Sequence, residues 1–495
     1  MDVKADAGRF DQVEADALVV SVFEGEDPTE GVIGEVNQAM EGLIKDLMGS
    51  DELRGKSGDM VYLYRPGNVK ARRVLLVGVG KREDFDLDSV RQLAGSAVRY
   101  LRGKGARTVA ILRRSQIDIV AAAEAAVEGA LIGLYEPDVY RTSDREERRI
   151  ETLILCTAGG GSAEDLERGI ARGRILGEST NFTRELVNEP SNAMTPEALS
   201  LKAQEMASRL GMEIDILDEP RLHELGMGAI LGVGRGSDEP SRLVVLRYLP
   251  EGAPADRTVA IVGKGVTFDT GGISIKPSDG MEKMKYDMAG AAAVFGAMRA
   301  IGLLQPNVNV LGIAPLVENM PSGRALKPGD IVKGLSGRSI EILNTDAEGR
   351  LILSDAISYA RRLGATEIID LATLTGAVSV ALGHVNAAIL GTDDELVARL
   401  IGAGNAAGEK LWRLPLDPEF REIVKSDVAD LKNSTGRAAG TITAAHFLRE
   451  FAEDTPWAHL DIAGMAWQNE KKAFMAKGPS GFGVRTLVNY VACNE

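Results

Sequence analysis

The segment Asn344-Thr-Asp-Ala-Glu-Gly-Arg350 places two acids and a guanidinium between two apolar stretches. Residues 339–343 before it alternate like a β-strand, and residues 351–361 after it have the apolar spacing of a helix. Its charged residues are therefore predicted to lie where a strand ends and a helix begins, the usual place for an α/β active site. The segment also fits a structural interpretation, in which Asp346 caps the helix, Glu348 complements its dipole and the glycine relaxes the turn.

A second acidic cluster lies upstream and makes the purely structural interpretation incomplete. The β-branched run 258–262 has the composition of a buried strand, and Lys264 and Asp269 follow it in the predicted loop. Asp287 opens an alanine-rich helix predicted over residues 288–304, which is apolar on most sides and therefore buried. A charged residue at the start of a buried helix is expected to be paired or bound to a metal.

The two clusters together carry four carboxylates, a charge that two divalent cations would neutralise. Oxygen-rich sites suit Mg or Mn, and Zn also accepts carboxylates, so ligand type leaves the metal open. The chain has four histidines, and all of them lie outside both clusters: His223, His384, His446 and His459. Each is interpreted as a packing or hydrogen-bonding residue because no metal-binding motif surrounds it.

These segments resemble the leucyl (cytosol) aminopeptidases, a family of dinuclear metallo-exopeptidases. The family signature Asn-Thr-Asp-Ala-Glu-Gly-Arg-Leu is complete at residues 344–351, with no departure at a metal or catalytic position. Upstream, the lysines and aspartates that match the family spacing are Lys264, Asp269, Lys276 and Asp287. Further similar stretches are 188–196, 370–377, 457–464 and 481–487, so the resemblance extends from about residue 181 to the C-terminus.

The resemblance implies two divalent metal ions per subunit, Mn or Zn with Mg or Co as alternatives. Asp269 and Glu348 would bridge the metals, Asp346 would complete one site, and Lys264 with Asp287 would complete the other. A lysine can ligate only as the neutral amine, which adjacent dications favour by opposing its ammonium form.

The resemblance also implies the catalytic groups. A water held between the metals would attack the scissile carbonyl, and protonated Lys276 would donate to the oxyanion. Arg350 would hold a bicarbonate ion as general base, because a guanidinium binds a planar oxyanion with two parallel hydrogen bonds. The predicted reaction is the release of N-terminal leucine or other apolar residues from peptides with a free N-terminus.

The residues implied to bind substrate are Met284, Asn344, Thr373, Leu374 and Gly376. A methionine suits the side chain of leucine or methionine at the first position. Met284 fits equally well as a core residue at the start of a buried helix.

Composition agrees with a soluble cytoplasmic enzyme. The net charge of −15 disfavours phosphate backbones, and no basic stripe is evident, so we expect no nucleic-acid binding. Two cysteines, Cys156 and Cys493, suit a reducing cytoplasm. The N-terminus has no secretory pattern, and we expect no membrane span, because the longest apolar stretch, 120–135, is interrupted by two glutamates.

The predicted fold class is α/β with two domains. We expect a smaller N-terminal α/β domain over residues 1–160 that serves assembly, a linker helix over 161–186, and a catalytic domain over 187–495. Strands of the first are predicted at 17–23, 73–78, 108–112 and 152–156. Strands of the second, in a mostly parallel sheet flanked by helices, are predicted at 242–246, 258–262, 309–313, 339–343 and 367–371. The resemblance adds a homohexamer, a dimer of trimers.

Three other functions were weighed. A nucleotide-binding enzyme is suggested by the glycines at 76–80 and 232–236, but neither completes a fingerprint, and tight turns explain both. A scaffold or DNA-binding accessory protein could share the fold, although the complete set of site residues argues against lost catalysis. A dinuclear phosphoesterase uses similar metal chemistry, and the lysine ligand and the wider peptidase signatures disfavour it.

Overall fold

The computed structural model describes residues 1–114, 117–145, 148–159 and 162–492, and it divides into two compact units. The first comprises Met1–Asn181 with Glu470–Lys477, and the second comprises Phe182–Asn469 with the segment from Gly478 onward. The predicted domain boundary at residues 160 and 161, and Cys493, lie outside the described residues. Cys156 is buried, and burial raises the pKa of its thiol to about 12, so it stays protonated at neutral pH.

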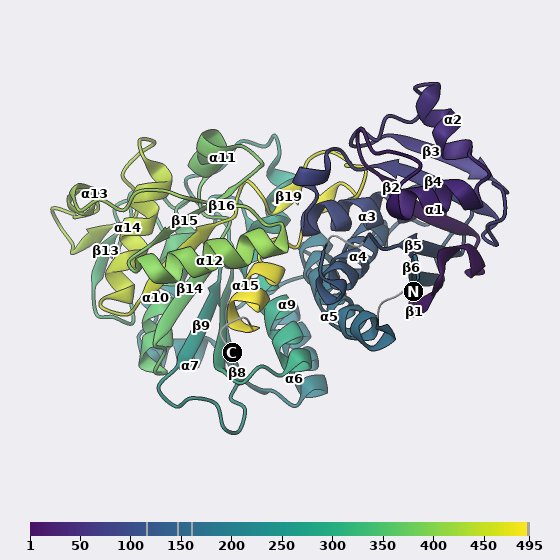
Figure 1. Cartoon of the computed structure of the whole chain (residues 1–495). Coiled ribbons are helices and arrows are strands. Elements are labelled where there is room, and N and C mark those ends of the chain that lie inside the picture. Colours follow the sequence, from purple (N-terminus) through teal and green to yellow (C-terminus); the bar gives the residue numbers. More distant parts are fainter. Residues whose placement is uncertain (115–116, 146–147, 160–161, 493–495) are drawn as a thin grey trace. The chain divides into compact units, whose positions relative to one another are not determined.

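The first unit contains a six-stranded sheet in the order β1-β6-β5-β2-β4-β3, parallel except for the β3–β4 pair (Figure 1). Its strands are β1 (Asp2–Arg9), β2 (Ala17–Val22), β3 (Met60–Tyr64), β4 (Arg73–Gly78), β5 (Thr108–Leu112) and β6 (Thr152–Thr157). The four predicted strands are β2, β4, β5 and β6. Of the two missed edge strands, β1 has charged residues between its apolar ones, whereas β3 is apolar in sequence but only partly buried.

Helices cover both faces of this sheet, and two hydrophobic clusters fill the space between. The helices are α1 (Gly31–Ala39), α2 (Leu43–Gly49), α3 (Leu87–Gly103), α4 (Ile119–Leu134) and the first part of α5 (Ala163–Asn188). Two short 3-10 helices complete the unit, η1 (Phe10–Gln12) and η2 (Arg82–Asp84).

The second unit is built on a nine-stranded, mostly parallel sheet, as predicted. Its order is β16-β15-β18-β14-β9-β11-β8-β7, with β10 paired to β11, and β18, β14, β9 and β11 form a parallel centre. The strands are β7 (Glu213–Leu217), β8 (Arg242–Tyr248), β9 (Thr258–Gly263), β10 (Gly265–Asp269), β11 (Asn309–Asn319), β14 (Glu367–Ala372), β15 (Ala387–Gly391), β16 (Leu411–Arg413) and β18 (Trp457–Asp461).

Helices pack on both faces of this sheet too. One group contains α6 (Pro196–Leu210), α9 (Ala289–Leu304), α12 (Asp394–Ala407) and α15 (Val484–Ala492). The other contains α7 (Glu219–Leu225), α8 (Gly228–Gly234), α10 (Glu348–Arg362), α13 (Glu419–Ile423) and α14 (Gly440–Ala452). The remaining helices are η3 (Met281–Met288), which precedes α9, and α11 (Gly376–Leu382).

Two predictions about this unit need correction. The strand predicted at 339–343 is the shorter β13 (Ser339–Glu341), which pairs with β12 (Ile331–Lys333) and β17 (Leu431–Lys432) in a separate small sheet. Of the glycines at 232–236, Gly232 and Gly234 lie in α8 rather than in a turn, whereas Gly236 lies in the turn that follows, where the Ser237 N–H donates to the Gly234 carbonyl at 3.0 Å. A second small sheet joins β19 (Trp467–Gln468) and β20 (Gly478–Pro479).

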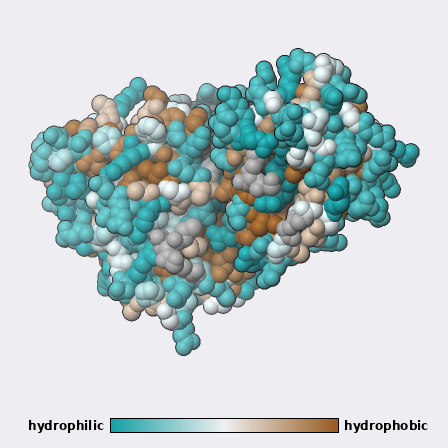
Figure 2. Space-filling view, viewed as in Figure 1, coloured by the Kyte–Doolittle hydropathy of each residue, from teal (hydrophilic) through white to brown (hydrophobic). Residues whose placement is uncertain are grey.

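Helix α9 is the buried helix that the sequence predicts, and nearly all of its residues are buried. The stretch Met281–Leu304 is long and apolar enough to cross a membrane by length and composition, but most of it is buried within the fold, as in a core helix. Hydrophilic side chains cover most of the face drawn in Figure 2, in keeping with the charge of −15.

The side chain of Asp355 holds α10 in place, the helix that begins at Glu348. Its buried carboxylate accepts hydrogen bonds from the backbone N–H groups of Ala229 and Ile230, both at 3.0 Å, and of Leu335 at 2.7 Å. In Asp355→Asn one accepting oxygen becomes an NH2 group, which donates and cannot accept, so at least one backbone donor loses its partner. We expect a loss of about 2 kcal/mol, seen as a lower midpoint in a thermal melt followed by circular dichroism.

The matched control is Asp393→Asn. Asp393 caps α12 by accepting one hydrogen bond from the Leu396 N–H at 2.7 Å. Asparagine is as good a cap as aspartate, so this variant should melt within a degree or two of the wild type, roughly. An equal drop in both variants would contradict the role assigned to Asp355.

Candidate metal centre

The ends of the central strands position the charged residues of the site. Lys264 lies between β9 and β10, and Asp269 is the last residue of β10. Asp287 lies in η3, immediately before α9, and Glu348 is the first residue of α10. Strands that run in parallel end at one edge of the sheet, so segments far apart in sequence meet there.

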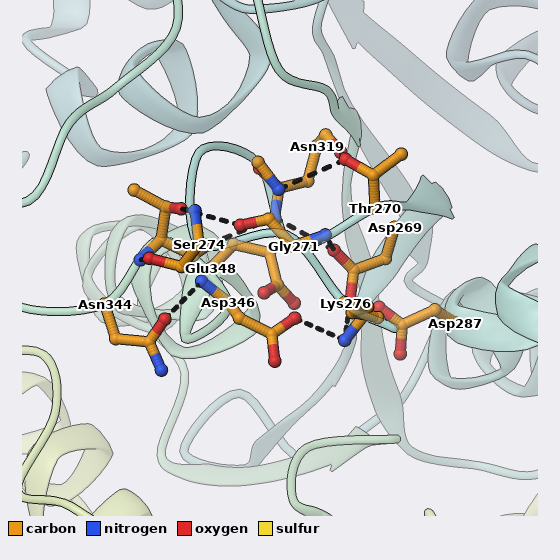
Figure 3. A network of polar contacts seen from close by, with 12 residues as sticks. Asp269, Thr270, Gly271, Ser274, Lys276, Asp287, Asn319, Asn344, Asp346 and Glu348 are labelled. Atoms are coloured by element: carbon orange, nitrogen blue, oxygen red, sulfur yellow. Dashed lines mark hydrogen bonds and ion pairs between the residues drawn. The ribbon is translucent and has the colours of Figure 1, made fainter. Parts of the chain in front are cut away.

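Three carboxylates come together at this edge. Asp269, Asp346 and Glu348 each offer an oxygen, and these oxygens lie within 4.8 Å of one another. Lys276 lies between two of them, with its Nζ 2.7 Å from Asp269 Oδ2 and in an ion pair with Asp346 (Figure 3). Asp269 and Glu348 are buried, whereas Asp346 is half-buried.

Lys264 joins the fourth carboxylate to this cluster. Its Nζ is 2.7 Å from Asp287 Oδ2 and 2.8 Å from Glu348 Oε1, and it donates a hydrogen bond of 2.9 Å to the Thr373 carbonyl. Two ammonium groups therefore face four carboxylates, which leaves the centre with excess negative charge.

The pKa shifts reflect this excess of buried charge. Burial, with the neighbouring Asp269 and Glu348, raises the pKa of Asp287 to about 8 despite Lys264. Burial and Glu348 raise the pKa of Asp346 to about 6. Burial opposes the charge of Lys264, but Asp287 and Glu348 outweigh it and raise its pKa above the ordinary value.

The centre fits a divalent cation. Glu348 Oε2 is buried and accepts no hydrogen bond within the described chain, so one oxygen of the cluster has no proton donor. Carboxylate oxygens suit hard divalent ions, and a cation there would supply both the missing partner and the missing positive charge.

The proposed cap for α10 is absent. The N-cap position is Ala347, which makes no side-chain capping bond, and Asp346 pairs with Lys276. Gly349 lies inside the helix and does not relax a turn. A Cβ there would lie 2.7 Å from Lys264 Cε and 2.9 Å from its Nζ, so the glycine leaves room for that lysine.

Asn319 supports the cluster and was missed by the sequence analysis. Its Nδ2 donates to Asp269 Oδ1 at 2.9 Å and to the Thr345 carbonyl at 3.0 Å. Thr345 Oγ1 in turn donates to the Gly271 carbonyl at 2.6 Å. The strand predicted from the sequence ended at residue 313, whereas β11 extends to Asn319, so no sequence signal marked this residue.

Arg350 lies beside the cluster on the first turn of α10. Its Nη1 donates to the Asn433 carbonyl at 2.8 Å, while its buried Nε has no partner within the described chain. Burial lowers the pKa of this guanidinium to about 10, a value still high enough for the group to be charged at neutral pH. The free donor suits an oxyanion such as bicarbonate.

Asn433 is a second residue that sequence reasoning missed. Its backbone carbonyl accepts the hydrogen bond from Arg350. Its side-chain Oδ1 accepts from the Leu343 N–H at 2.8 Å, and its Nδ2 donates to the Asn344 carbonyl at 2.7 Å. It thereby holds the turn that carries Asp346. Nothing in the sequence around residue 433 signals this role.

A cavity of about 720 Å³ opens beside Asp346 and Arg350. Of the residues implied to bind substrate, the structure places Asn344, Leu374 and Gly376 on its lining. Met284 and Thr373 are not among the lining residues.

The two remaining residues are linked to Asp287, Met284 by sharing η3 and Thr373 by a hydrogen bond. Met284 is half-buried in η3 rather than in the core, and the Thr373 hydroxyl donates to Asp287 Oδ1 at 2.7 Å. The loop that follows Thr373 is held by buried Asp461, which accepts from the Leu374 N–H at 3.2 Å and from the Thr375 hydroxyl at 2.6 Å.

The carboxylate cluster contains no histidine. Buried His459 lies with Nδ1 2.6 Å from Asp370 Oδ1, and His384 Nδ1 lies 2.7 Å from the Gly464 carbonyl. Both are hydrogen-bonding residues, as the sequence indicated.

Known proteins match the chain over nearly all of its length. The model of the cytosol aminopeptidase family, catalytic domain, matches residues 181–488, and the model of its N-terminal domain matches residues 19–144. A probable cytosol aminopeptidase of Solibacter usitatus is 50% identical, covering 98% of each chain, and one of Koribacter versatilis is 47% identical, covering 97% of each.

Solved structures agree with these matches. A mutant of tomato leucine aminopeptidase has a TM-score of 0.90 at 34% identity, over 100% of this chain and 97% of its own. The bottromycin maturation enzyme BotP in complex with Mn has a TM-score of 0.85 at 36% identity, over 97% of this chain and 99% of its own.

Fold, carboxylate cluster and matches together define a metallo-exopeptidase. The chain belongs to the cytosol aminopeptidase family, and the resemblance predicted from its sequence is confirmed. It is a hydrolase with cytosol aminopeptidase activity, which acts on peptides.

Proposed function

We propose that the chain releases N-terminal leucine and other apolar residues, using two divalent ions held by five residues. The observation that carries this is the convergence of Asp269, Asp346 and Glu348 within 4.8 Å, joined to Asp287 through Lys264. Asp269 and Glu348 would bridge the ions, Asp346 would complete one site, and Asp287 with Lys264 the other. Mn or Zn suits these donors, with Mg or Co as alternatives.

When bound, the ions would lower the pKa of a water between them and polarise the scissile carbonyl. Lys276 reaches the cluster with a raised pKa, because Asp269 and Glu348 outweigh the effect of burial, so it keeps its proton and can donate to an oxyanion. Arg350 has an unused buried donor with which to hold bicarbonate as general base.

Specificity would follow from the α-amine and the side chain of the first substrate residue. A free α-amine is a good metal donor, and a blocked one is not, so the enzyme should act only on unblocked N-termini. Half-buried Met284 in η3 offers a soft apolar contact for the first side chain. Asn344, Leu374, Gly376 and Thr373 would hold the peptide beside it.

The activity is tested with leucine p-nitroanilide and its N-acetylated form, on protein stripped of metal by a chelator. We expect added Mn or Zn to restore cleavage of the free-amine substrate only. Absence of cleavage with any metal, from folded protein, would favour the phosphoesterase or scaffold alternatives.

In the same assay Glu348→Ala should lose metal and activity together, whereas Arg350→Ala should keep metal and lose about a hundredfold in rate. Equal metal loss in both would contradict these roles.

Metal affinity should rise with pH. In the metal-free protein Asp287 has a pKa of about 8 and Asp346 of about 6, so below these values each holds a proton that a metal must displace. We expect Mn affinity to fall at least tenfold from pH 8 to pH 7, because Asp287 contributes about fivefold and the proton of Lys264 adds to it, and to fall further towards pH 6, in competition titrations with a chelator. Asp287→Asn should make the dependence between pH 7 and 8 shallower and leave the part that comes from the Lys264 ammonium, which must also lose its proton to bind a metal. A wild-type affinity that stays flat over this range would contradict the assignment.

We further propose a cytoplasmic homohexamer, a dimer of trimers, that does not bind nucleic acid or membranes. The proposal rests on the family and on the acidic charge of the chain. Light scattering should give a mass of six chains of 52.7 kDa each. A monomer at micromolar concentration would count against it.

A further inference from the structure

The cavity beside the metal centre extends away from the carboxylates. Asp346 and Arg350 lie on its lining near the cluster, and apolar side chains such as Leu374, Val380 and Ile442 form other parts of its wall. At about 720 Å³ its volume is within the range of small-ligand sites. Asn344, Leu374 and Gly376, proposed above to hold the peptide beside its first residue, also lie on the lining, so a peptide cleaved at the cluster would extend the residue after the scissile bond into the remainder of this cavity.

Arg437 lines the same cavity and is exposed. In the described part of the chain it makes no ion pair or hydrogen bond. Its loop is shaped by two residues with positive φ, Gly436 at 89° and Ala439 at 52°. A left-handed alanine costs conformational energy, so packing around the loop must hold it in place.

The first turn of α14 adds a positive electrostatic potential to that of Arg437. Gly440, Thr441 and Ile442 line the cavity, and α14 has no side-chain cap. Their backbone N–H groups have no acceptor among the described residues. Together with the unpaired guanidinium, this wall of the cavity favours a negatively charged group.

The geometry points to Arg437 as the residue that binds the C-terminal carboxylate of a dipeptide substrate. This inference rests on the proposed function, because it needs the scissile bond at the carboxylate cluster. In a dipeptide the carboxylate lies one residue beyond that bond, within the cavity. The chain carries a charge of −15 and repels anions in general, so a local cation is needed to accept one. A guanidinium binds a carboxylate with two parallel hydrogen bonds, which a lysine does not reproduce.

The test compares four substrates: Leu-Gly, Leu-Gly-amide, Leu-Asp-amide and leucine p-nitroanilide. The wild-type enzyme should cleave Leu-Gly with a kcat/KM about tenfold above that of Leu-Gly-amide, mainly through KM, and this ratio should shrink in high salt because Arg437 is exposed. In Arg437→Gln the ratio should fall to about one through a loss on Leu-Gly alone, and Arg437→Lys should keep part of it. The matched control is Arg362→Gln, an exposed arginine at the C-terminal end of α10 that should leave the ratio unchanged.

The outcomes separate the two proposals. Cleavage of leucine p-nitroanilide at the wild-type rate by Arg437→Gln shows that the metal centre and the fold are intact. If neither the wild-type protein nor any variant cleaves leucine p-nitroanilide, the proposed function itself is contradicted. If it is cleaved but the Leu-Gly ratio is the same in wild type and Arg437→Gln, the role of Arg437 is overturned. A wild-type preference for Leu-Asp-amide over Leu-Gly would also overturn it, since the cavity would then bind a side-chain carboxylate.

Discussion

The ammonium group of Lys264 holds together three segments that lie far apart in the sequence. It contacts Asp287 before α9, Glu348 at the start of α10 and the carbonyl of Thr373 after β14. All three partners are buried, so the charges of Lys264, Asp287 and Glu348 are compensated by one another rather than by water. Removing one partner of such a buried set typically costs about 3–5 kcal/mol. In the metal-free protein the positions of Asp287 and Glu348 therefore depend on this lysine, as those of Asp269 and Asp346 depend on Lys276.

The sheet brings these groups close, and neutral side chains set their final positions. Strands β9 and β10, both parallel to β11, place Lys264 and Asp269 at one edge of the sheet but do not fix the orientation of their side chains. Asn319 then orients Asp269, and Asn433 holds the turn before α10. Neutral amides can both donate and accept, so they stiffen a site of excess negative charge without adding to it.

The sequence placed Asp269 in a loop, although this residue ends strand β10. It predicted the charged residues that meet at this edge and some of the elements beside them, because β-branched runs and helix spacing are local signals. The buried β9 and the buried α9 are examples. It did not predict the supporting amides Asn319 and Asn433, whose roles depend on contacts across the fold. It also placed residues 339–343 in the main sheet, because alternation marks a strand but does not identify the sheet that it joins.

The start of α10 shows how the site departs from ordinary helix design. A helix usually satisfies its first N–H groups with a capping side chain, but Ala347 offers none, and the nearby acid, Asp346, faces Lys276 instead. Gly349, a poor helix former, follows directly because any larger residue would collide with Lys264. The helix is held by contacts elsewhere, at Asp355 and through Arg350 to Asn433. Local preference is thus given up at the chemical end of the helix, and long-range hydrogen bonds supply the order that the missing cap would have given.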